Sequence, residues 1–469
     1  MQRKKLHIRS ALLFMGSGLC AYCARAQIIV TLPQTNIQTR ADYSTTINAG
    51  QYNSVLTVLP TFRVRAGAPS FNSTVNTNFA ASLVHIKLAS IGALPLLSLS
   101  GNTEVALSTS NQNLYTALAS IASGQVMANT RIATASQTWT AGDYSNSLFF
   151  STQGLLAGSI SPTSFTLTIS VPAFISPPST IGSTTVLVND LNFYRSANAV
   201  SGSKVIPVST TVPYVPSLRT GSAQFSFNTS FPYINLPVVP VSAVSTTLNG
   251  VATANTVSLS TSDQPLTSAS GIAVPTNNSH TVTHSYSISA AQLKNNFLQA
   301  GTYSTPLTYT WSKPSSADPP NPVQAQASGS LNIVVSDLGE IIANQQNINL
   351  NFVTANDYKN GISVNSPAHL RVSKTTPYNL YVRATSNSFV SGANSIPLNV
   401  LRIGPMAGQT GISTITLSTT AQQLIQNANP VIDRNLDIQF SIPASETNKL
   451  LNKPSGSYVA TIVYSFVAP

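Results

Sequence analysis

Charge is scarce in this 469-residue chain: Asp, Glu, Lys and Arg make up 7% of it, with 12 acidic and 23 basic side chains. The basic residues are spread singly and form no clustered stripe, so no nucleic-acid partner is expected. The only two cysteines, Cys20 and Cys23, lie near the start. Because no run approaches the roughly 20 apolar residues of a spanning helix, no transmembrane segment is expected in the mature chain.

Residues 1–26 have the pattern of an export signal. A basic stretch, Arg3–Arg9, precedes the short apolar run Ala11–Leu19 and the small-x-small sequence Ala24–Ala26. Signal peptidase I cuts this kind of sequence, so cleavage is expected between Ala26 and Gln27. Both cysteines would leave with the leader, which excludes disulfides and thiol chemistry from the mature chain. Five of the 23 basic residues and none of the 12 acidic ones would leave too, lowering the formal charge from +11 to +6.

Metal-binding patterns are missing as well. His280 and His284 are four residues apart, and on a strand that spacing separates them by about 13 Å, too far for one ion. Asn356 and Asp357 have no second acid nearby of the kind that a calcium loop requires. We therefore expect no metal and no cofactor.

Catalytic patterns are equally thin. The acids that come near one another in sequence, Asp433 with Asp437 and Asp337 with Glu340, fit turns or strand edges better than a catalytic pair. No nucleophile elbow and no phosphate loop lies between a strand and a helix. The protein is predicted not to be an enzyme. A secreted hydrolase whose acids converge only in space is the alternative that these patterns leave open.

What the chain does have is serine, threonine, asparagine and β-branched residues, with 24 glycines and 29 prolines between them. β-Branched residues fit a pleated sheet, whereas good helix formers are few. Hydrophobic residues make up 42% of the chain, which is enough for packed cores. The composition predicts an all-β protein made of antiparallel sandwiches.

Two motifs recur three times. The first is an alternating apolar pair followed by a turn, at Val105–Leu114 (VALSTSNQNL), Val257–Leu266 (VSLSTSDQPL) and Ile415–Leu424 (ITLSTTAQQL). The second begins with glycine and has tyrosine two residues later, at Gly142–Phe150 (GDYSNSLFF), Gly301–Trp311 (GTYSTPLTYTW) and Gly456–Phe466 (GSYVATIVYSF). The pair repeats roughly every 155 residues, which indicates tandem copies of one folded unit.

These copies predict three Ig-like or pilin-like sandwiches after the signal peptide. Their expected ranges are 27–153, 160–312 and 327–469, with a proline-rich linker at 313–326. Phe165–Val171 is expected to open the second copy, and Leu114–Met127 is the best helical candidate. Tyr303–Trp311 contains Pro306, which cannot donate to a β-ladder, so this stretch is predicted to be an edge strand.

The second motif predicts a closing strand. Its glycine allows a tight turn, and its tyrosine enters the inward face with the hydroxyl near the rim, where it can be hydrogen-bonded. Trp311 falls in an inward position and is expected in the core. Trp139 precedes the turn at Gly142 and is the more open tryptophan, so it is the candidate for stacking on a sugar.

The third copy resembles two bacterial surface families. Tyr378-Asn-Leu380-Tyr-Val382 stands where WxL-type cell-wall domains have Trp-x-Leu-x-Val, and Tyr458–Pro469 is similar to their closing sequence. Tyr378 and Tyr464 take the places of the two tryptophans of that pattern. The Gly-x-Tyr ending also resembles the last strand of pilin and spore-coat-protein-U-type sandwiches. The WxL resemblance implies noncovalent attachment to the cell wall.

Together these features predict a non-enzymatic structural or adhesive protein, secreted or held at the bacterial cell surface. Linked modules gain avidity even when each contact is weak, and an exposed edge strand could accept a strand from a neighbouring subunit. The expected partner is an envelope polymer, a glycan or another surface protein. A carbohydrate- or peptidoglycan-binding protein is the alternative.

Overall fold

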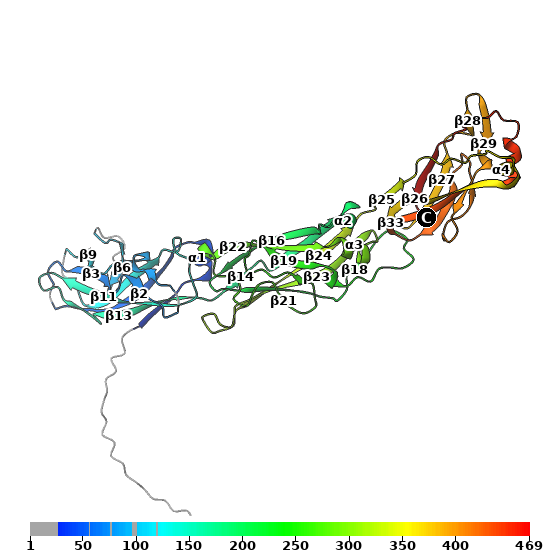
Figure 1. The fold of residues 1–469 in the computed structure, drawn as a ribbon. Helices are drawn as coiled ribbons and strands as arrows, with labels where there is room; N and C mark the ends of the chain where they lie inside the picture. The colour runs from blue at the N-terminus through cyan, green and yellow to red at the C-terminus, as the bar shows by residue number, and fades with distance from the viewer. Residues whose placement is uncertain (1–26, 56, 76, 96–100, 119–120) are drawn as a thin grey trace, which may run out of the picture. The chain divides into compact units, whose positions relative to one another are not determined.

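The computed structural model describes residues 27–55, 57–75, 77–95, 101–118 and 121–469 (Figure 1). The predicted signal peptide, including Ala26 at its end, lies outside the described residues. The chain divides into two compact units, Met1–Pro172 and Ala173–Pro469. Within the described part of the chain, no helix is long and apolar enough to cross a membrane.

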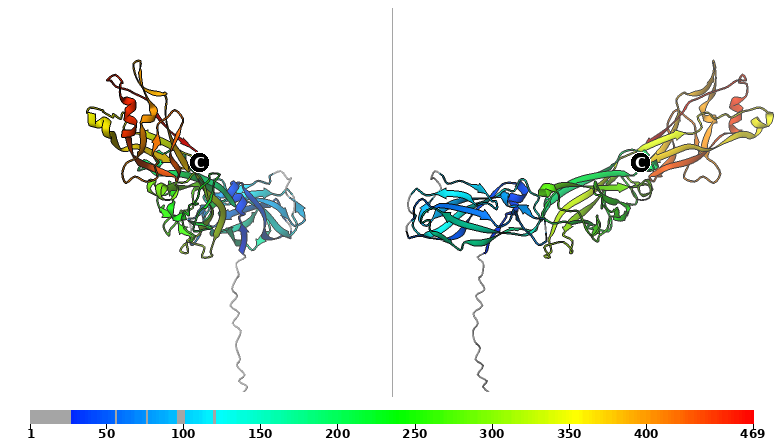
Figure 2. Two further views of the ribbon diagram at one scale, coloured as in Figure 1. Left: turned by 90° about the vertical axis from the view of Figure 1, so that its right-hand side faces the viewer. Right: turned by 60° about the vertical axis from the view of Figure 1, so that its left-hand side comes forward.

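The first unit is a β-sandwich whose two layers are visible in blue to cyan in Figures 1 and 2. One sheet has the spatial order β1 (Gln27–Thr31), β13 (Ser164–Val171), β11 (Gly142–Gln153), β3 (Thr61–Ala66), β9 (Gln112–Thr116). The other has the order β12 (Ser159–Ser161), β2 (Tyr43–Asn53), β10 (Gly124–Ile132), β6 (Val84–Ile91), β7 (Leu94–Pro95), and β8 (Val105–Ala106) also pairs with β6. Alternate residues of β11 and β10, such as Leu148, Phe150 and Ala128, are buried between the sheets. A short hairpin, β4 (Ser70–Phe71) with β5 (Phe79–Ala80), and helix α1 (Gln34–Thr39) complete the unit.

The second unit contains two further pairs of sheets, in residues 173–335 (the middle region) and 336–469 (the terminal region). In the middle region one sheet has the order β14 (Ile175–Ser176), β16 (Val200–Thr210), β22 (Ser279–Ile288), β19 (Ser245–Asn249), β20 (Val257–Ser258). The other has the order β15 (Thr180–Val188), β24 (Gln324–Val335), β23 (Gly301–Ser312), β17 (Val215–Thr220), β21 (Gln264–Pro265), with β18 (Ser226–Asn228) also paired to β23. Its helices are α2 (Asn192–Arg195) and α3 (Ala290–Asn296).

In the terminal region one sheet has the order β25 (Gly339–Ala343), β26 (Gly361–Lys374), β33 (Val431–Pro443), β30 (Arg402–Pro405), β31 (Ile415–Thr416). The facing sheet has three strands in the order β32 (Gln422–Ala428), β27 (Tyr378–Ala384), β34 (Ile462–Val467). The hairpin β28 (Ser388–Ser391) with β29 (Asn394–Pro397), helix α4 (Ala355–Asn360) and the 3-10 segment Ala444–Leu450 complete it.

The first motif has the same role at each of its three positions. It begins in a short strand of one sheet (β8, β20 or β31) and ends in a strand of the other sheet (β9, β21 or β32). Its leucine is buried each time, and the leucine N–H donates at 2.9 Å to the carbonyl at the start of a strand of the first sheet or just before it, from Leu107 to Val84, from Leu259 to Val244 and from Leu417 to Leu401. The motif therefore carries the chain from one sheet of a sandwich to the other.

The predicted all-β sandwich class is confirmed, but the predicted helix over Leu114–Met127 is wrong. Leu114 lies in β9, and β10 begins at Gly124. The apolar spacing there resembled a helix because two strands with a turn between them can place apolar residues three or four apart. Cross-strand pairing of β9 with β3 and of β10 with β2 decides the backbone conformation instead.

Tyr303–Trp311 is not an edge strand, because β23 lies between β24 and β17. Pro306 is accommodated because its carbonyl accepts from Gly221 N at 3.0 Å, directly after β17 ends at Thr220 and before β18 begins. The nitrogen and carbonyl of one strand residue point to the same side. The Pro306 nitrogen, which carries no hydrogen, therefore faces the interval between β17 and β18. No strand residue there needs its N–H as a donor, so the sheet loses no hydrogen bond.

Two segments lie in other places than the sequence indicated. Phe165–Val171, expected to open the second copy, belongs to β13 and pairs with β11 and β1 of the first unit. The stretch 313–326, expected to be a spacer, forms the connection between β23 and β24 and the first residues of β24. Lys313 N donates to Val323 O at 2.9 Å across its base. Both errors have one cause: a further strand follows the closing strand and pairs back onto it.

Candidate functional site

The second motif forms a hydrogen-bonded corner at the start of each closing stretch. In every copy the tyrosine hydroxyl donates to the carbonyl four residues earlier, over 2.9 Å, from Tyr144 to Thr140, from Tyr303 to Gln299 and from Tyr458 to Pro454. Burial raises the pKa of Tyr144 and of Tyr303, which keeps both phenols protonated. The structural role predicted for this tyrosine is confirmed.

The closing strands differ in their neighbours. β11 is hydrogen-bonded to β13 on one side and to β3 on the other, and β23 is likewise held between β24 and β17. β34 pairs with β27, and within the described residues no strand pairs with its other edge. That edge of the terminal region is therefore open.

The open edge changes how deeply the closing strand is buried. Leu307, Tyr309 and Trp311 of β23 are at most 1% exposed. The matching residues of β34, Ile462, Tyr464 and Phe466, are only partly buried, although all three pack against the terminal core. The inward side chains of the closing strand are thus partly exposed to solvent where no strand pairs with its second edge.

A second stretch of the terminal region shows the same half-burial. No strand is assigned to Ile348–Val353, although its apolar residues alternate. Ile348, Leu350 and Phe352 still alternate inward and pack against the core, while Val353 is exposed. An extended backbone becomes a strand only when a neighbour takes its hydrogen bonds. This stretch and β34 both leave partly exposed apolar side chains that pack against the same terminal core.

A hydrogen-bonded network on the inward face of β34 holds this strand in place. His369 Nε2 lies 3.1 Å from the Tyr464 hydroxyl, and its Nδ1 lies 3.1 Å from the Ser366 hydroxyl. Burial lowers the pKa of His369 and raises the pKa of Tyr464, so both groups are neutral near pH 7. The edge strand is thereby held in register without a charge beneath it.

The residues that carry the WxL resemblance meet on two adjacent strands. Leu380 of β27 faces Phe466 of β34, and Val382 faces Tyr464. Tyr378 is fully buried, and its ring packs edge-on against Phe466 with 5.1 Å between centroids. These are the contacts of core residues along the open-edged sheet.

The first unit carries a different feature, an apolar loop cluster. The exposed residues Val58, Leu59, Leu155 and Leu156, with Val55 and Leu118 nearby, are each at least 43% exposed. Their loops are held together: Tyr52 hydroxyl donates to Ala157 O at 2.9 Å, Ala117 N donates to Pro60 O at 3.0 Å, and Ser54 hydroxyl donates to Ile121 O at 2.7 Å. Exposed apolar side chains gathered on neighbouring loops are typical of interaction surfaces. The sequence analysis missed it, although the leucine pair inside Gly154–Gly158 was a signal.

Two of the acids that the sequence singled out do converge. Glu340 of β25 and Asp433 of β33 both bind the Arg195 guanidinium of α2, at 2.5 and 2.8 Å. Burial alone would raise the pKa of Asp433, but the Arg195 hydrogen bond and the charges of Arg195 and Arg371 outweigh it and hold that pKa below its usual value. A glycosidase needs one carboxyl group that stays protonated to act as an acid. A pair bridged by a guanidinium instead ties the middle region to the terminal region.

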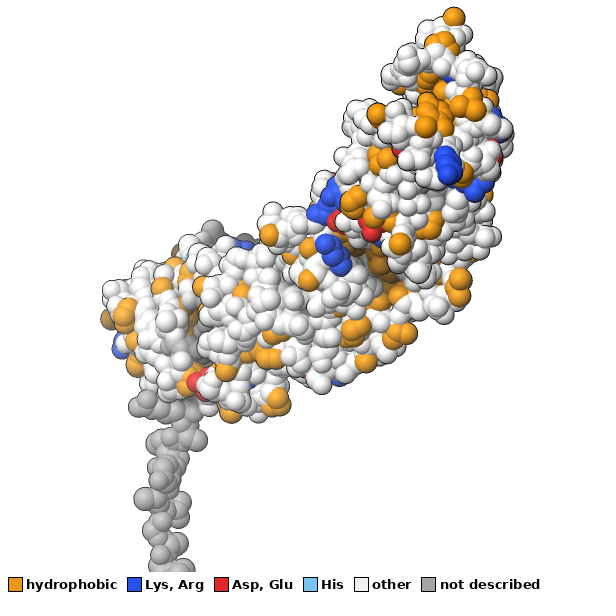
Figure 3. All heavy atoms as spheres, turned by 45° about the vertical axis from the view of Figure 1, so that its right-hand side comes forward, with side chains coloured by type: hydrophobic (Ala, Val, Ile, Leu, Met, Phe, Trp, Pro, Cys, Tyr) orange, Lys and Arg blue, Asp and Glu red, His pale blue; other side chains and the backbone are white. Residues whose placement is uncertain are grey.

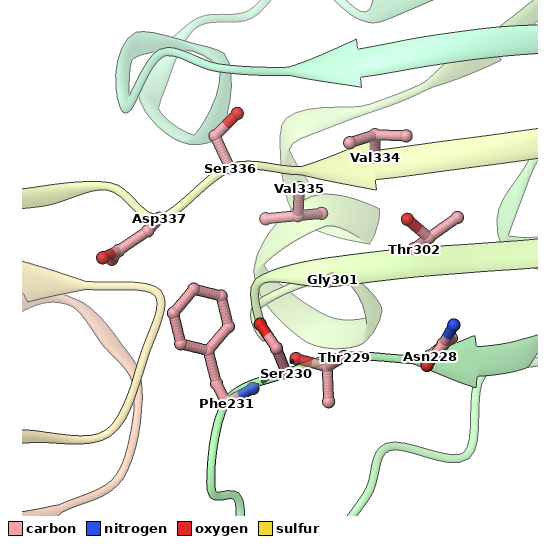
Figure 4. A pocket seen from close by; sticks show the side chains of 10 residues that line it. All are labelled: Asn228, Thr229, Ser230, Phe231, Gly301, Thr302, Val334, Val335, Ser336 and Asp337. Carbon is pink, nitrogen blue, oxygen red and sulfur yellow. Dashed lines mark hydrogen bonds between the residues drawn. The ribbon is translucent and has the colours of Figure 1, made fainter.

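A hollow of about 560 Å³ lies where the middle region ends. Figure 4 shows Phe231 and Asp337 at one end of it and Asn228 at the other. The Asp337 carboxylate accepts from the Thr376 hydroxyl at 3.0 Å and pairs with Lys374, so it already has partners. Nothing in this arrangement pairs a nucleophile with a base.

The sequence candidates for ligand binding are placed as follows. Trp139 is 1% exposed, its Nε1 donates to Thr134 O at 3.2 Å, and its ring packs against Phe79. Its burial leaves no exposed ring surface of Trp139 for stacking on a sugar. Trp311 is buried, as predicted. Asp357 caps α4 by accepting from the N–H of Val353 and of Thr354.

No protein-family model matches the chain, and no curated protein matches it. Some solved structures are similar. CfaE, the adhesive subunit of CFA/I fimbria of enterotoxigenic Escherichia coli, is 10% identical, with a TM-score of 0.26 over 66% of this chain and 98% of that chain. The CsuC-CsuE chaperone-tip adhesion subunit complex from Csu pili of Acinetobacter baumannii gives 15% identity and a TM-score of 0.30 over 62% and 99%. The CupB6 tip adhesin from Pseudomonas aeruginosa gives 12% and 0.26 over 63% and 88%. At this identity and TM-score the likeness carries no functional conclusion.

Proposed function

We propose that the chain is an exported, non-enzymatic protein of the cell surface with a structural and adhesive role, built from three sandwiches: the first unit, the middle region and the terminal region. Its terminal region accepts a β-strand from a neighbouring subunit along the open edge of β34. The observation that carries this proposal is the half-burial of Ile462, Tyr464 and Phe466 where the matching residues of β23 are buried.

The middle region and the first unit indicate what such a strand must look like. β24 runs antiparallel to β23 and buries Leu331, Ile333 and Val335, and β13 runs antiparallel to β11. A strand for β34 should therefore run antiparallel to it and present apolar side chains at alternate positions. Main-chain hydrogen bonds would supply affinity, and the side-chain positions would supply selectivity.

A peptide with the sequence of Ser164–Val171 (SFTLTISV) is a suitable probe, because the same sequence fills this position beside β11. Labelled peptide should bind the full chain, and fluorescence anisotropy would measure the affinity. Phe466→Ser should weaken binding about tenfold, because it removes apolar contact area from the inward face. Val467→Ser, on the outward face of the same strand, is the matched control and should leave the affinity unchanged. Absence of binding to the unaltered chain would count against strand acceptance.

The adhesive part of the proposal rests on the apolar loop cluster. Because its leucines and valines lie on neighbouring loops of one sandwich, they can bury apolar area against a hydrophobic surface at about 25 cal/mol per Å². Leu155→Ser with Leu156→Ser should reduce adsorption to an alkyl-coated surface. Ile234→Ser with Leu236→Ser removes equally apolar exposed residues from the middle region and serves as the control. Equal losses from both double variants would show that exposed apolar area anywhere is sufficient.

A further inference from the structure

The outward face of the sheet in the first unit carries two neighbouring arginines. Arg63 and Arg65 alternate with the buried Phe62 and Val64 on β3, so both guanidiniums lie on the solvent side. Two residues apart on one strand places their Cβ atoms about 7 Å from each other. In a chain with 7% charged residues, such a pair is unusual.

Each guanidinium is held by a neutral partner. Arg63 Nε donates to Asn113 Oδ1 of β9 at 2.8 Å, which orients the fork of Arg63. The Arg65 guanidinium lies over the Phe149 ring of β11, 3.9 Å from its centroid. An arginine stacked on an aromatic ring loses little further entropy when it binds a ligand.

Neither arginine has an ion-pair partner among the described residues. The residues opposite them, Asn113, Phe149 and Ser151, are uncharged. β11, the strand that carries Phe149, has one acidic residue, Asp143. It lies six residues from Phe149, about 20 Å along the strand. The two positive charges are therefore uncompensated on this face.

The other copies provide a comparison. In each copy, the serine that follows the first-motif leucine accepts a backbone hydrogen bond at its carbonyl oxygen, over 2.8 to 2.9 Å. The donors are the backbone N–H groups of Ala66, Thr220 and Ala384, so these three positions are equivalent. The residues just before them are Arg65, Arg219 and Arg383. The arginine at 65 is thus common to all copies, but Arg63 is matched by Ser217 and Tyr381. Arg219 lies 4.0 Å from Asp263. The sequence analysis treated these arginines as scattered and missed their common position.

We propose that Arg63 and Arg65 form a binding site for a polysaccharide that carries carboxylate groups. The charge-assisted fork of a guanidinium matches the two oxygens of a carboxylate, and two forks side by side fit successive acidic groups of one polymer. Serines and threonines of the outward face of β11 and β13, such as Ser147, Ser151 and Thr166, lie on the same surface and can bond sugar hydroxyls. An open sheet face suits an extended polymer. This site is independent of strand acceptance at β34.

The test is binding of the full chain to polygalacturonic acid, with dextran as the neutral control and dextran sulfate as the sulfated one. Arg63→Gln with Arg65→Gln should lower the affinity for polygalacturonic acid about tenfold or more, because two charge-assisted contacts are lost. Arg219→Gln with Arg383→Gln removes the same charge from equivalent strands and should change the affinity less than about twofold. Binding should weaken as NaCl is raised.

Arg63→Lys with Arg65→Lys separates geometry from charge, since lysine keeps the charge but lacks the fork. This variant should keep the thermal stability of the unaltered chain and recover only part of the affinity. Equal losses from the two glutamine variants would overturn the proposal in favour of net-charge attraction. Preference for dextran sulfate over polygalacturonic acid, full affinity in the lysine variant, or no binding by the unaltered chain would overturn it as well.

Discussion

The closing strands of the middle and terminal regions, β23 and β34, share a motif and differ in their surroundings. Both belong to a glycine-x-tyrosine motif whose tyrosine hydroxyl donates to the carbonyl four residues earlier, although β23 includes the glycine and tyrosine and β34 begins four residues after the tyrosine. β23 has a strand on each side and buries its inward residues, whereas β34 has one neighbour and leaves its inward residues partly exposed. The residues of a strand set which face is apolar, but only its neighbours determine how much of that face is covered.

The comparison also bears on cohesion of the second unit. The middle and terminal regions are connected by the Arg195 ion pairs and by the Tyr233 hydroxyl, which donates to Thr375 O at 2.9 Å. Figure 3 shows acidic and basic side chains close together on the face that it presents, amid largely uncharged surface. The terminal region is thus anchored at its Arg195 contact while its β34 edge remains open.

The largest expected effect comes from removing the two corner tyrosines one at a time. Tyr303 is fully buried and packs against Phe227 and Phe297, so Tyr303→Ala should lower the free energy of unfolding of the middle region by about 3–5 kcal/mol. Tyr458 is partly exposed, and Tyr458→Ala should cost the terminal region about 1–2 kcal/mol. Urea unfolding followed by peptide-resolved hydrogen exchange would measure both. Losses of equal size would break the comparison.

The next effect concerns acid stability. His284 is buried in the middle region with no hydrogen-bond partner among the described residues, and burial lowers its pKa from 6.5 to about 4. The unfolded chain protonates His284 near pH 6.5, whereas the folded chain does so only near pH 4. The free energy of unfolding should therefore be unaffected by His284 above about pH 6.5 and should fall by about 3 kcal/mol between pH 6.5 and pH 4.

The measurement is urea unfolding of the middle region between pH 7 and pH 4. His284→Phe, which cannot take up a proton, should remove this part of the pH dependence. His369 of the terminal region also has a lowered pKa from burial, but its ring is bonded to Ser366 and Tyr464. His369→Phe should therefore alter the acid sensitivity less. If His284→Phe lost as much unfolding free energy between pH 7 and pH 4 as the unaltered chain, His284 would not be the source of the acid sensitivity.

The smallest expected effect tests the anchoring of the terminal region. Arg195→Gln should weaken the coupling between the two regions by about 1–3 kcal/mol, because it removes the middle-region cation that hydrogen-bonds Glu340 and Asp433 and leaves them only the longer pairs with Arg371. Limited proteolysis near Asp337, with hydrogen exchange of β33, would report it. Arg219→Gln breaks an exposed pair at 4.0 Å and should change stability by about 0–1 kcal/mol. If Arg195→Gln also deepened the burial of β34, the open edge would depend on this anchor.

Much of the fold was predictable from the sequence. The recurring motifs predicted an inward leucine followed by a turn and an inward tyrosine with a hydrogen-bonded hydroxyl, because both features depend on residues close together in the sequence. The crossing between sheets was not predicted, since Leu107, Leu259 and Leu417 donate to carbonyls 23, 15 and 16 residues earlier. The strand at Phe165–Val171 was recognised but given to the wrong neighbour. Pairing of β13 with β11 and β1 is a long-range contact that alternation alone does not encode.

The sites were less predictable. An edge strand was expected at Tyr303–Trp311 on the strength of Pro306, whereas the open edge is at β34, which contains no proline. Alternation is the same for covered and uncovered strands, so it could not distinguish them. The apolar loops and the Arg63–Arg65 pair depend on which turns and faces meet in space. Trp139 was misjudged because a turn nearby does not imply exposure: Phe79, sixty residues earlier in the chain, covers its ring.

Hydrogen exchange of the unmodified, isolated chain tests the central claim most directly. The backbone amides of β34 should exchange about 100-fold faster than those of β23, because one side of β34 has no ladder partner and its inward side chains are partly solvated. Protection of β34 equal to that of β23 would show that the edge is covered in solution and would contradict the account.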